Sequence, residues 1–233
     1  MNNNNLKLTV IIGVLIALFV TAVPILNAQG YPPGFDISIE WEHFEEQSKD
    51  GQEMDSTQLG AKINYSMPQT FDVFVALSRD DVDVSLRLDQ TDNRLQDLDI
   101  DPALAFRIGG KLYALRAIPM GVPADFVLSF SYSTANHDFE YTDTNSQIKK
   151  DDFTHSRIIG TAGLEWRYVR STPYLNIGVL YSKLDTASIK DYDQTSLLIA
   201  AGIYVPFVEN IFFRAEVNVC QEIGYAVGVQ YRF

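Results

Sequence analysis

The chain has 233 residues, with 30 acidic and 18 basic side chains and a formal net charge of −12 at pH 7. Nucleic-acid binding depends largely on Lys and Arg side chains that neutralise phosphates, so this charge balance excludes that class of protein. Cys220 is the single cysteine, which excludes an intrachain disulfide and any metal site built from several cysteines.

The N-terminal segment is typical of a secretory signal. A short polar start that contains Lys7 leads into a mostly apolar stretch from Leu8 to Leu26, and the small residue Ala28 follows. We therefore predict export, a cleaved signal peptide over residues 1–28 and one domain over residues 29–233. An uncleaved anchor helix is the alternative, because a bilayer crossing needs roughly 20 apolar residues.

Beyond residue 28, apolar and polar residues alternate with a period of two, which predicts an all-β domain. The first and last alternating runs are Phe35 to Glu46 and Gly224 to Phe233, and we expect them to pair. Ten strands are expected, with eight or twelve as alternatives. The eight strands between them centre on Leu59–Tyr65, Phe71–Leu77, Phe106–Leu112, Phe126–Tyr132, Ile158–Tyr168, Leu175–Tyr181, Leu197–Val205 and Phe213–Val219.

The alternation changes phase after the third strand. Val82, Val84, Leu86 and Leu88 alternate out of phase with the apolar positions before Arg79. A β-bulge shifts the face of a strand by one residue, so we predict a bulge near Arg79 and a strand that continues beyond the membrane.

The connections alternate between short and long, which is typical of transmembrane barrels with short periplasmic turns. The sequence therefore predicts a closed, antiparallel, up-and-down transmembrane β-barrel. The short connections are expected at Met67–Thr70, Ile118–Pro123, Arg170–Pro173 and Pro206–Asn210, and the long ones at Ser48–Ser56, Arg79–Pro102, Thr134–His155 and Leu184–Thr195. A tight connection at Cys220–Glu222 is the exception to this alternation.

The two faces of the expected strands differ in chemistry. One face is apolar, with aromatic residues near the strand ends, as expected at the border between hydrocarbon and lipid headgroups. The other face carries charges of both signs, which we expect to form a paired network in the lumen because unpaired buried charges are costly. Its members are Lys62, Arg107, Lys111, Arg157, Arg167, Arg214 and Arg232, with Asp36, Glu40, Glu42, Asp72, Glu165 and Glu216.

The last residues follow the pattern glycine, two residues, aromatic, one residue, aromatic: Gly228, Tyr231 and Phe233. In this the chain resembles the small bacterial outer-membrane β-barrel family, which includes porin-like and OmpA-type barrel domains, although Ala226 stands where that family has a polar residue. The resemblance implies a Gram-negative outer-membrane location, contact with lipid and lipopolysaccharide, and recognition of the terminal residues by the β-barrel assembly machinery. It implies nothing about a ligand.

Barrels of about this size are filled by side chains, so we expect a largely plugged barrel with a structural or surface-loop binding role. A narrow ion or small-solute channel is the alternative, followed by a soluble lipocalin-like carrier or an outer-membrane enzyme. We expect no cofactor and no catalysis. His43 lies near the end of the first strand, and His137 and His155 bracket a predicted loop, where His155 and Ser156 lie beside Asp151 and Asp152. Solvated loop histidines are expected there.

The segment from Asp80 to Asp101 is rich in aspartate and is predicted to be a solvated loop. Clustered carboxylates are ligands for hard divalent cations, so this loop carries a hypothesis of Ca²⁺ or Mg²⁺ bridging. It lacks the spacing of a dedicated calcium loop. Its aspartates are Asp80, Asp81, Asp83, Asp89, Asp92, Asp97, Asp99 and Asp101.

Overall fold

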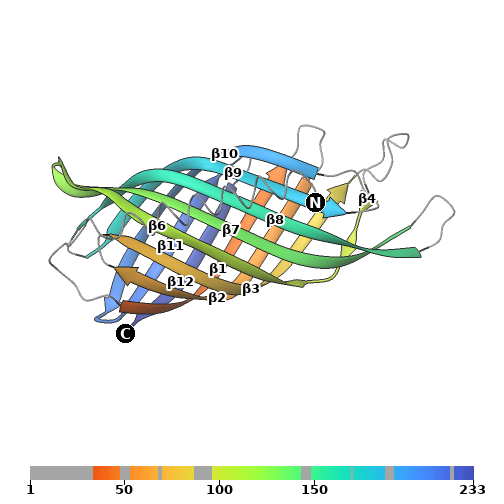
Figure 1. Cartoon of the computed structure of the whole chain (residues 1–233), viewed down its shortest axis with the longest axis horizontal. Helices are drawn as coiled ribbons and strands as arrows, with labels where there is room; N and C mark the ends of the chain where they lie inside the picture. Colours follow the sequence, from red (N-terminus) through yellow and green to blue (C-terminus); the bar gives the residue numbers. More distant parts are fainter. Residues whose placement is uncertain are drawn as a thin grey trace, which may run out of the picture.

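Ten antiparallel strands close into a tilted barrel (Figure 1). The structure is a computed structural model that describes residues 34–47, 53–67, 70–86, 96–142, 148–168, 170–186, 192–220 and 223–233. The predicted signal peptide over residues 1–28 lies outside the described residues. Among the described residues, no helix is long and apolar enough to cross a bilayer.

The chain order of the strands is also their order around the barrel, which confirms the predicted up-and-down topology and the count of ten. Two further strands of two residues each, β4 (Gln96–Asp97) and β5 (Asp99–Ile100), add to the edges of β3 and β7. The ten barrel strands are β1 (Gly34–Gln47), β2 (Glu53–Met67), β3 (Phe71–Leu86), β6 (Ala103–Met120), β7 (Val122–Thr142), β8 (Ile148–Trp166), β9 (Thr172–Thr186), β10 (Tyr192–Val208), β11 (Ile211–Val219) and β12 (Ile223–Arg232).

The first and last strands close the barrel, as predicted. β1 pairs with β12 from Asp36 opposite Arg232 to His43 opposite Tyr225. The N–H of the terminal Phe233 donates to the carbonyl oxygen of Phe35 over 3.0 Å. Closure matters because a strand edge that faced hydrocarbon would leave its backbone groups without hydrogen-bond partners.

The predicted bulge near Arg79 is wrong. β3 pairs with β2 without a register shift, with Leu59 opposite Arg79 and Gln58 opposite Asp80. What changes there is the environment of the two faces. Toward the end of the barrel that holds the C-terminus, which we call the lower end, Val75 and Leu77 point outward and are exposed. Toward the opposite, upper end, Val82 and Val84 point inward and are buried.

The same inversion occurs on the neighbouring strands and divides the barrel into two parts. The lower part carries an apolar belt of exposed outward side chains, and the upper part, which we call the distal extension, has a polar exterior and an apolar interior. β7 alone has 21 residues, about twice the 9–11 that cross a bilayer. The apolar belt includes Ile37, Ile39, Leu59, Ile63, Val73, Val75, Leu77, Ile108, Leu128, Ile177, Val179, Leu197, Val217, Val227 and Val229.

The distal extension has a core of its own. The rings of Phe139 and Phe153 lie 5.7 Å apart in the middle of this core. Its buried members are Met54, Val82, Val84, Leu98, Phe139, Phe153 and Leu184. An exposed apolar belt around a charged lumen is the opposite of what a soluble lipocalin-like carrier needs, so that alternative is wrong for this fold.

One of the predicted long loops is largely strand, and a second begins as strand. β7 and β8 remain paired from Ala135 opposite His155 to Thr142 opposite Ile148, so most of the predicted loop from Thr134 to His155 belongs to the barrel wall. The N-terminal part of the segment from Arg79 to Pro102 likewise belongs to β3. The outward side chains of these strands are polar, so the sequence there has the polar composition expected of a loop.

Candidate functional site

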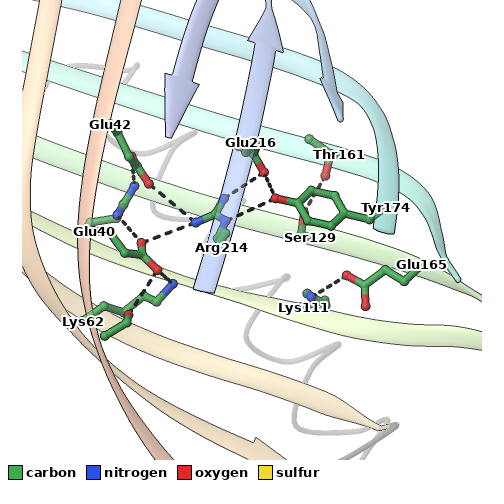
Figure 2. A network of polar contacts seen from close by, with 12 residues as sticks. Glu40, Glu42, Lys62, Lys111, Ser129, Thr161, Glu165, Tyr174, Arg214 and Glu216 are labelled. Carbon is green, nitrogen blue, oxygen red and sulfur yellow. Dashed lines mark hydrogen bonds and ion pairs between the residues drawn. The ribbon is translucent and has the colours of Figure 1, made fainter. Parts of the chain in front are cut away.

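The centre of the lumen is occupied by a charge network around Glu40 of β1 (Figure 2). Glu40 is buried and contacts three cations, each from a different strand. Lys62 of β2 pairs with one carboxylate oxygen, Oε1. Arg107 of β6 and Arg214 of β11 approach the other oxygen, Oε2, to 3.3 Å and 3.5 Å. Because β6 and β11 lie on opposite sides of the ring, these contacts span the lumen.

The network continues through two further carboxylates. Arg107 donates to Glu42 over 2.5 Å, and Arg214 lies 2.9 Å from Glu216. The Tyr174 hydroxyl donates to the same Glu216 oxygen and accepts a hydrogen bond from Arg214 Nε over 3.2 Å. Arg214 also lies 3.9 Å from Glu42. Arg107 is therefore held between two carboxylates and Arg214 among three, which fixes their positions across the barrel.

Most other residues of the predicted lumen set form separate ion pairs, whereas Asp72 accepts a hydrogen bond from the Tyr113 hydroxyl over 3.2 Å. Lys111 donates to Glu165 over 2.6 Å beside the network (Figure 2). Two pairs lie toward the end of the barrel that holds the C-terminus. They are Arg232 with Asp36, at 2.9 Å, and Arg167 with Asp125, at 2.7 Å between Nε and Oδ2.

Arg157 lies above the network rather than in it. It is buried, 3.6 Å from Glu46, with its guanidinium 4.4 Å from the centre of the Phe44 ring. The Arg157–Glu46 pair thus separates the lumen from the distal extension.

A polar cavity of about 370 Å³ surrounds the network. Its lining extends from Asp36 and Arg232 near the C-terminal end to Phe44 and Asn218 at the upper limit. The cavity is large enough to hold small polar molecules. Its charged side chains are already paired with one another, so they do not form an empty charged binding site.

The terminal motif occupies both faces of β12. Tyr231 and Phe233 point outward, and their rings meet edge to face at 4.9 Å. Gly228 faces the lumen beneath the network, where an added Cβ would lie 3.1 Å from Glu40 Cγ and 3.1 Å from the carbonyl oxygen of Ile39. The glycine therefore makes room for the side chain at the centre of the network.

A second polar cluster lies at the base of the distal extension, and it overturns the expectation of solvated loop histidines. Asp80 and His137 are fully buried and His155 is 3% exposed. Asp80 Oδ2 lies 3.2 Å from His137 Nε2 and 3.3 Å from His155 Nδ1. The third histidine, His43, lies toward the end of β1, as predicted, and on its outer face, with hydrogen bonds to Thr57 and Glu45.

The electrostatics of this cluster favour an ionised aspartate. Burial alone would raise the pKa of the Asp80 carboxyl, but the close contacts with the imidazoles of His137 and His155 hold that pKa well below its usual range. Burial lowers the pKa of His155, and its hydrogen bond with Asp80 offsets this only in part.

Ser182, His155 and Asp80 lie in the order of a Ser-His-Asp triad, with 3.4 Å between Ser182 Oγ and His155 Nε2. Ser182 is fully buried, however, and does not line the lumen cavity. A hydroxyl in this position is a hydrogen-bond partner of the ring rather than a nucleophile that a substrate can reach.

The residues that lie beside His155 in the sequence do not share one face of β8. His155 points inward, whereas Asp152 is exposed on the outer face of β8. Ser156, also on the outer face, has Thr134 as its partner at 3.4 Å. A strict period-two reading would have found the buried cluster, since Asp80 is in phase with Val82, His137 with Phe139 and His155 with Phe153.

The predicted acidic loop is likewise divided. Asp80 points into the barrel, Asp81 and Asp83 point outward from β3, and Asp101 is exposed. Asp89 and Asp92 lie outside the described residues, and the side chains of Asp97 and Asp99 are not described. Among the residues that the structure describes, Asp80, His137 and His155 form the one group of three side chains positioned to share a metal ion.

Known structures with this fold are outer-membrane barrels. The sequence itself matches no protein-family profile and no curated protein. The translocator domain of the autotransporter NalP from Neisseria meningitidis aligns over 97% of this chain and 98% of its own, with a TM-score of 0.54 and 10% identity.

Two other similar structures are Ail from Yersinia pestis, with a TM-score of 0.42, 15% identity and coverage of 87% of this chain and 100% of its own, and the protease OmpT from Escherichia coli, with a TM-score of 0.46, 10% identity and coverage of 88% and 99%. At 10% identity the likeness to the NalP domain supports the fold of an outer-membrane β-barrel and not an activity.

Proposed function

We propose that the protein is an outer-membrane barrel that does not conduct and that holds a rigid, acidic extension at the cell surface. The observation that carries this proposal is obstruction of the barrel at two levels. Charged side chains from opposite walls meet at Glu40, and above them the apolar core around Phe139 and Phe153 fills the distal extension.

The orientation follows from the two ends of the barrel. In outer-membrane barrels the short turns face the periplasm, and here the strands on either side of Gly121 and of Glu209–Asn210 are joined by such turns. The distal extension at the other end is then extracellular. Its outer face carries Asp81 and Asp83 of β3 and Glu45 and Asp55 beside them. Burial and the nearby Glu45 carboxylate raise the pKa of Asp55, as expected where acidic groups crowd together.

This surface gives the protein a structural or presenting role rather than a catalytic one. Partners that fit it are lipopolysaccharide, which surrounds the extension, and divalent cations between the exposed carboxylates of both. The cation hypothesis for the surface aspartates remains a prediction, separate from the buried cluster around Asp80.

Conductance in planar bilayers tests the closed barrel. We expect the full-length protein, refolded and inserted, to give no stepwise single-channel current under conditions in which an open porin gives large steps. Removing both obstructions with Glu40→Ala, Arg214→Ala and Phe153→Ala in one chain should bring steps or a noisy leak. Regular steps from the unaltered protein would instead favour the narrow channel, with the 370 Å³ lumen cavity as part of its path.

The terminal motif supports recognition by the β-barrel assembly machinery, and a matched pair of aromatics tests it. Phe233 and Phe207 are 70% and 69% exposed, and each packs its ring against one neighbouring aromatic. We expect Phe233→Ala to lower the amount of folded, heat-modifiable barrel in outer membranes several-fold, and Phe207→Ala to change it little. An equal loss in the two variants would mean that Phe233 contributes only as a girdle aromatic.

A further inference from the structure

Three side chains from three strands each bring one ligand atom close to those of the other two at the base of the distal extension. They are Asp80 Oδ2 of β3, His137 Nε2 of β7 and His155 Nδ1 of β8, all within 4.8 Å of one another. The carboxylate oxygen of Asp80 lies 3.2 Å from His137 Nε2 and 3.3 Å from His155 Nδ1, which are distances typical of two ligand atoms bound to one ion. A tetrahedral ion with bonds of about 2.0–2.1 Å places its ligands about 3.3–3.4 Å apart.

The second nitrogen of each histidine and the second oxygen of Asp80 already have hydrogen-bond partners. His137 Nδ1 lies 3.1 Å from the main-chain carbonyl oxygen of Asp101, His155 Nε2 lies 3.4 Å from Ser182 Oγ, and Asp80 Oδ1 accepts a hydrogen bond from Ser56 over 2.9 Å. Metal-binding histidines usually hold their second nitrogen in this way, which fixes the ring orientation and the tautomer. The phenyl ring of Phe153 stacks on His137 at 5.0 Å and fixes its plane further.

The contact of His137 with Asp101 has a consequence for its other nitrogen. A carbonyl oxygen only accepts, so Nδ1 must carry the proton, and in the neutral ring Nε2 is then a bare lone pair. That lone pair faces a carboxylate oxygen at 3.2 Å, in a place where both residues are fully buried. Two acceptors in such a position need a cation or an additional proton between them.

The charged side chains around the cluster do not neutralise the carboxylate of Asp80. Glu46 and Arg157 are buried nearby and lie 3.6 Å from each other, so together they add no net charge. Asp80 therefore brings an uncompensated negative charge to the cluster. His155, by contrast, needs no additional proton, since its Nδ1–H can donate to Asp80 while Nε2 accepts from Ser182.

We propose that Asp80, His137 and His155 bind one divalent transition-metal ion, with Zn²⁺ as the best fit to two imidazole nitrogens and one carboxylate oxygen. The ion joins β3, β7 and β8 just above the apolar belt, where the wall of the barrel changes from a polar to an apolar interior. Because the three ligands are buried, the ion is incorporated as the barrel folds. Its role is to stabilise the distal extension.

Metal content after folding tests the proposal. The full chain is refolded in detergent micelles with Zn²⁺ or with Co²⁺, freed of loosely bound ions by gel filtration with a weak chelator, and assayed for metal per folded chain. We expect about one equivalent of Zn²⁺, and for Co²⁺ the intense visible bands of a tetrahedral site with nitrogen and oxygen ligands. Less than about a tenth of an equivalent in the folded, unaltered protein would overturn the proposal and leave a shared proton between His137 and Asp80.

Variants locate the ion. His137→Gln and Asp80→Asn should retain no metal, whereas Ser56→Ala, which removes only a hydrogen bond to Asp80, should weaken binding by about 10–100-fold. His43→Gln is the matched control, because His43 lies on the outside of β1, and Cys220→Ser removes the thiol as a competing ligand. Equal loss of metal in His43→Gln and His137→Gln would contradict the assignment. If the ligand variants do not fold, the Co²⁺ spectrum of the Cys220→Ser protein alone decides between a tetrahedral site and none.

Discussion

Replacing Glu40 with alanine is expected to lower the free energy of unfolding by about 3–5 kcal/mol, because it leaves buried cations without their shared partner. Lys62, Arg107 and Arg214 all contact this carboxylate, and each of the three side chains is less than one-fifth exposed. In the variant, the three cations that Glu40 holds together in the unaltered protein also repel one another. Glu42 and Glu216 remain, so Arg107 keeps Glu42 and Arg214 keeps both, whereas Lys62 loses the carboxylate that it contacts.

Urea unfolding of the barrel in detergent or lipid, followed by the fluorescence of Trp41 and Trp166, measures this loss. Asp81→Ala is the matched control, since it breaks an ion pair with Arg79 whose side chains are 66% and 48% exposed. An exposed pair of this kind contributes at most about 1 kcal/mol. If Glu40→Ala costs no more than Asp81→Ala, the lumen is wet enough to solvate its charges, and the closed-barrel proposal loses its main support.

The barrel itself could be predicted from the sequence because alternation with a period of two reports directly on a wall with two different faces. Phe35, Ile37 and Ile39 had to face one environment, and Asp36, Ser38 and Glu40 the other, so the strand and its faces followed together. The pairing of β1 with β12 followed from the requirement that no strand edge meets lipid.

The distal extension could not be predicted in the same way, because alternation does not say which environment each face meets. Val82 and Val84 show the same period as Val73 and Val75 but point to the opposite side, where the interior is dry and the exterior meets water. A bulge was the simpler explanation as long as one face was assumed to be apolar along its whole length. The histidine cluster could not be predicted for the same reason, since His137 and His155 lie on strands in a segment that the sequence predicts to be a loop.

The ion-pair partners of the lumen arginines could not be predicted from the sequence either. The sequence placed Arg107, Arg157 and Arg214 on the inner face, but strand faces do not specify which carboxylate each reaches across the barrel. Arg214 contacts Glu40 from β11, two strands away from β1, whereas Arg157 pairs with Glu46 above the network. These contacts depend on strand tilt and register, which decide the level of each side chain along the barrel axis.

Replacing Phe153 with alanine is expected to cost about 3–5 kcal/mol, and the loss should fall mainly on the distal extension. Phe153 is 3% exposed and packs its ring against both Phe139 and His137. Its removal leaves a cavity among β7, β8 and the neighbouring strands, where there is no lipid to fill it. The belt below is held by lipid and by the charge network, so it should remain folded while the extension opens.

Limited proteolysis and hydrogen exchange separate these two parts of the barrel. In Phe153→Ala we expect faster exchange and cleavage in β7 beyond Ala135 and in β8 before His155, with an unchanged gel shift of the barrel on heating. Ile148→Ala is the control, because Ile148 lies on the same strand but is 71% exposed, and its loss should cost no more than about 0.5 kcal/mol. Phe153→Leu, which refills part of the space, should recover much of the protection. If Phe153→Ala instead loosens the whole barrel at once, the extension and the belt unfold as one cooperative unit, and the extension owes its rigidity to the lipid-embedded strands below it rather than to its own core.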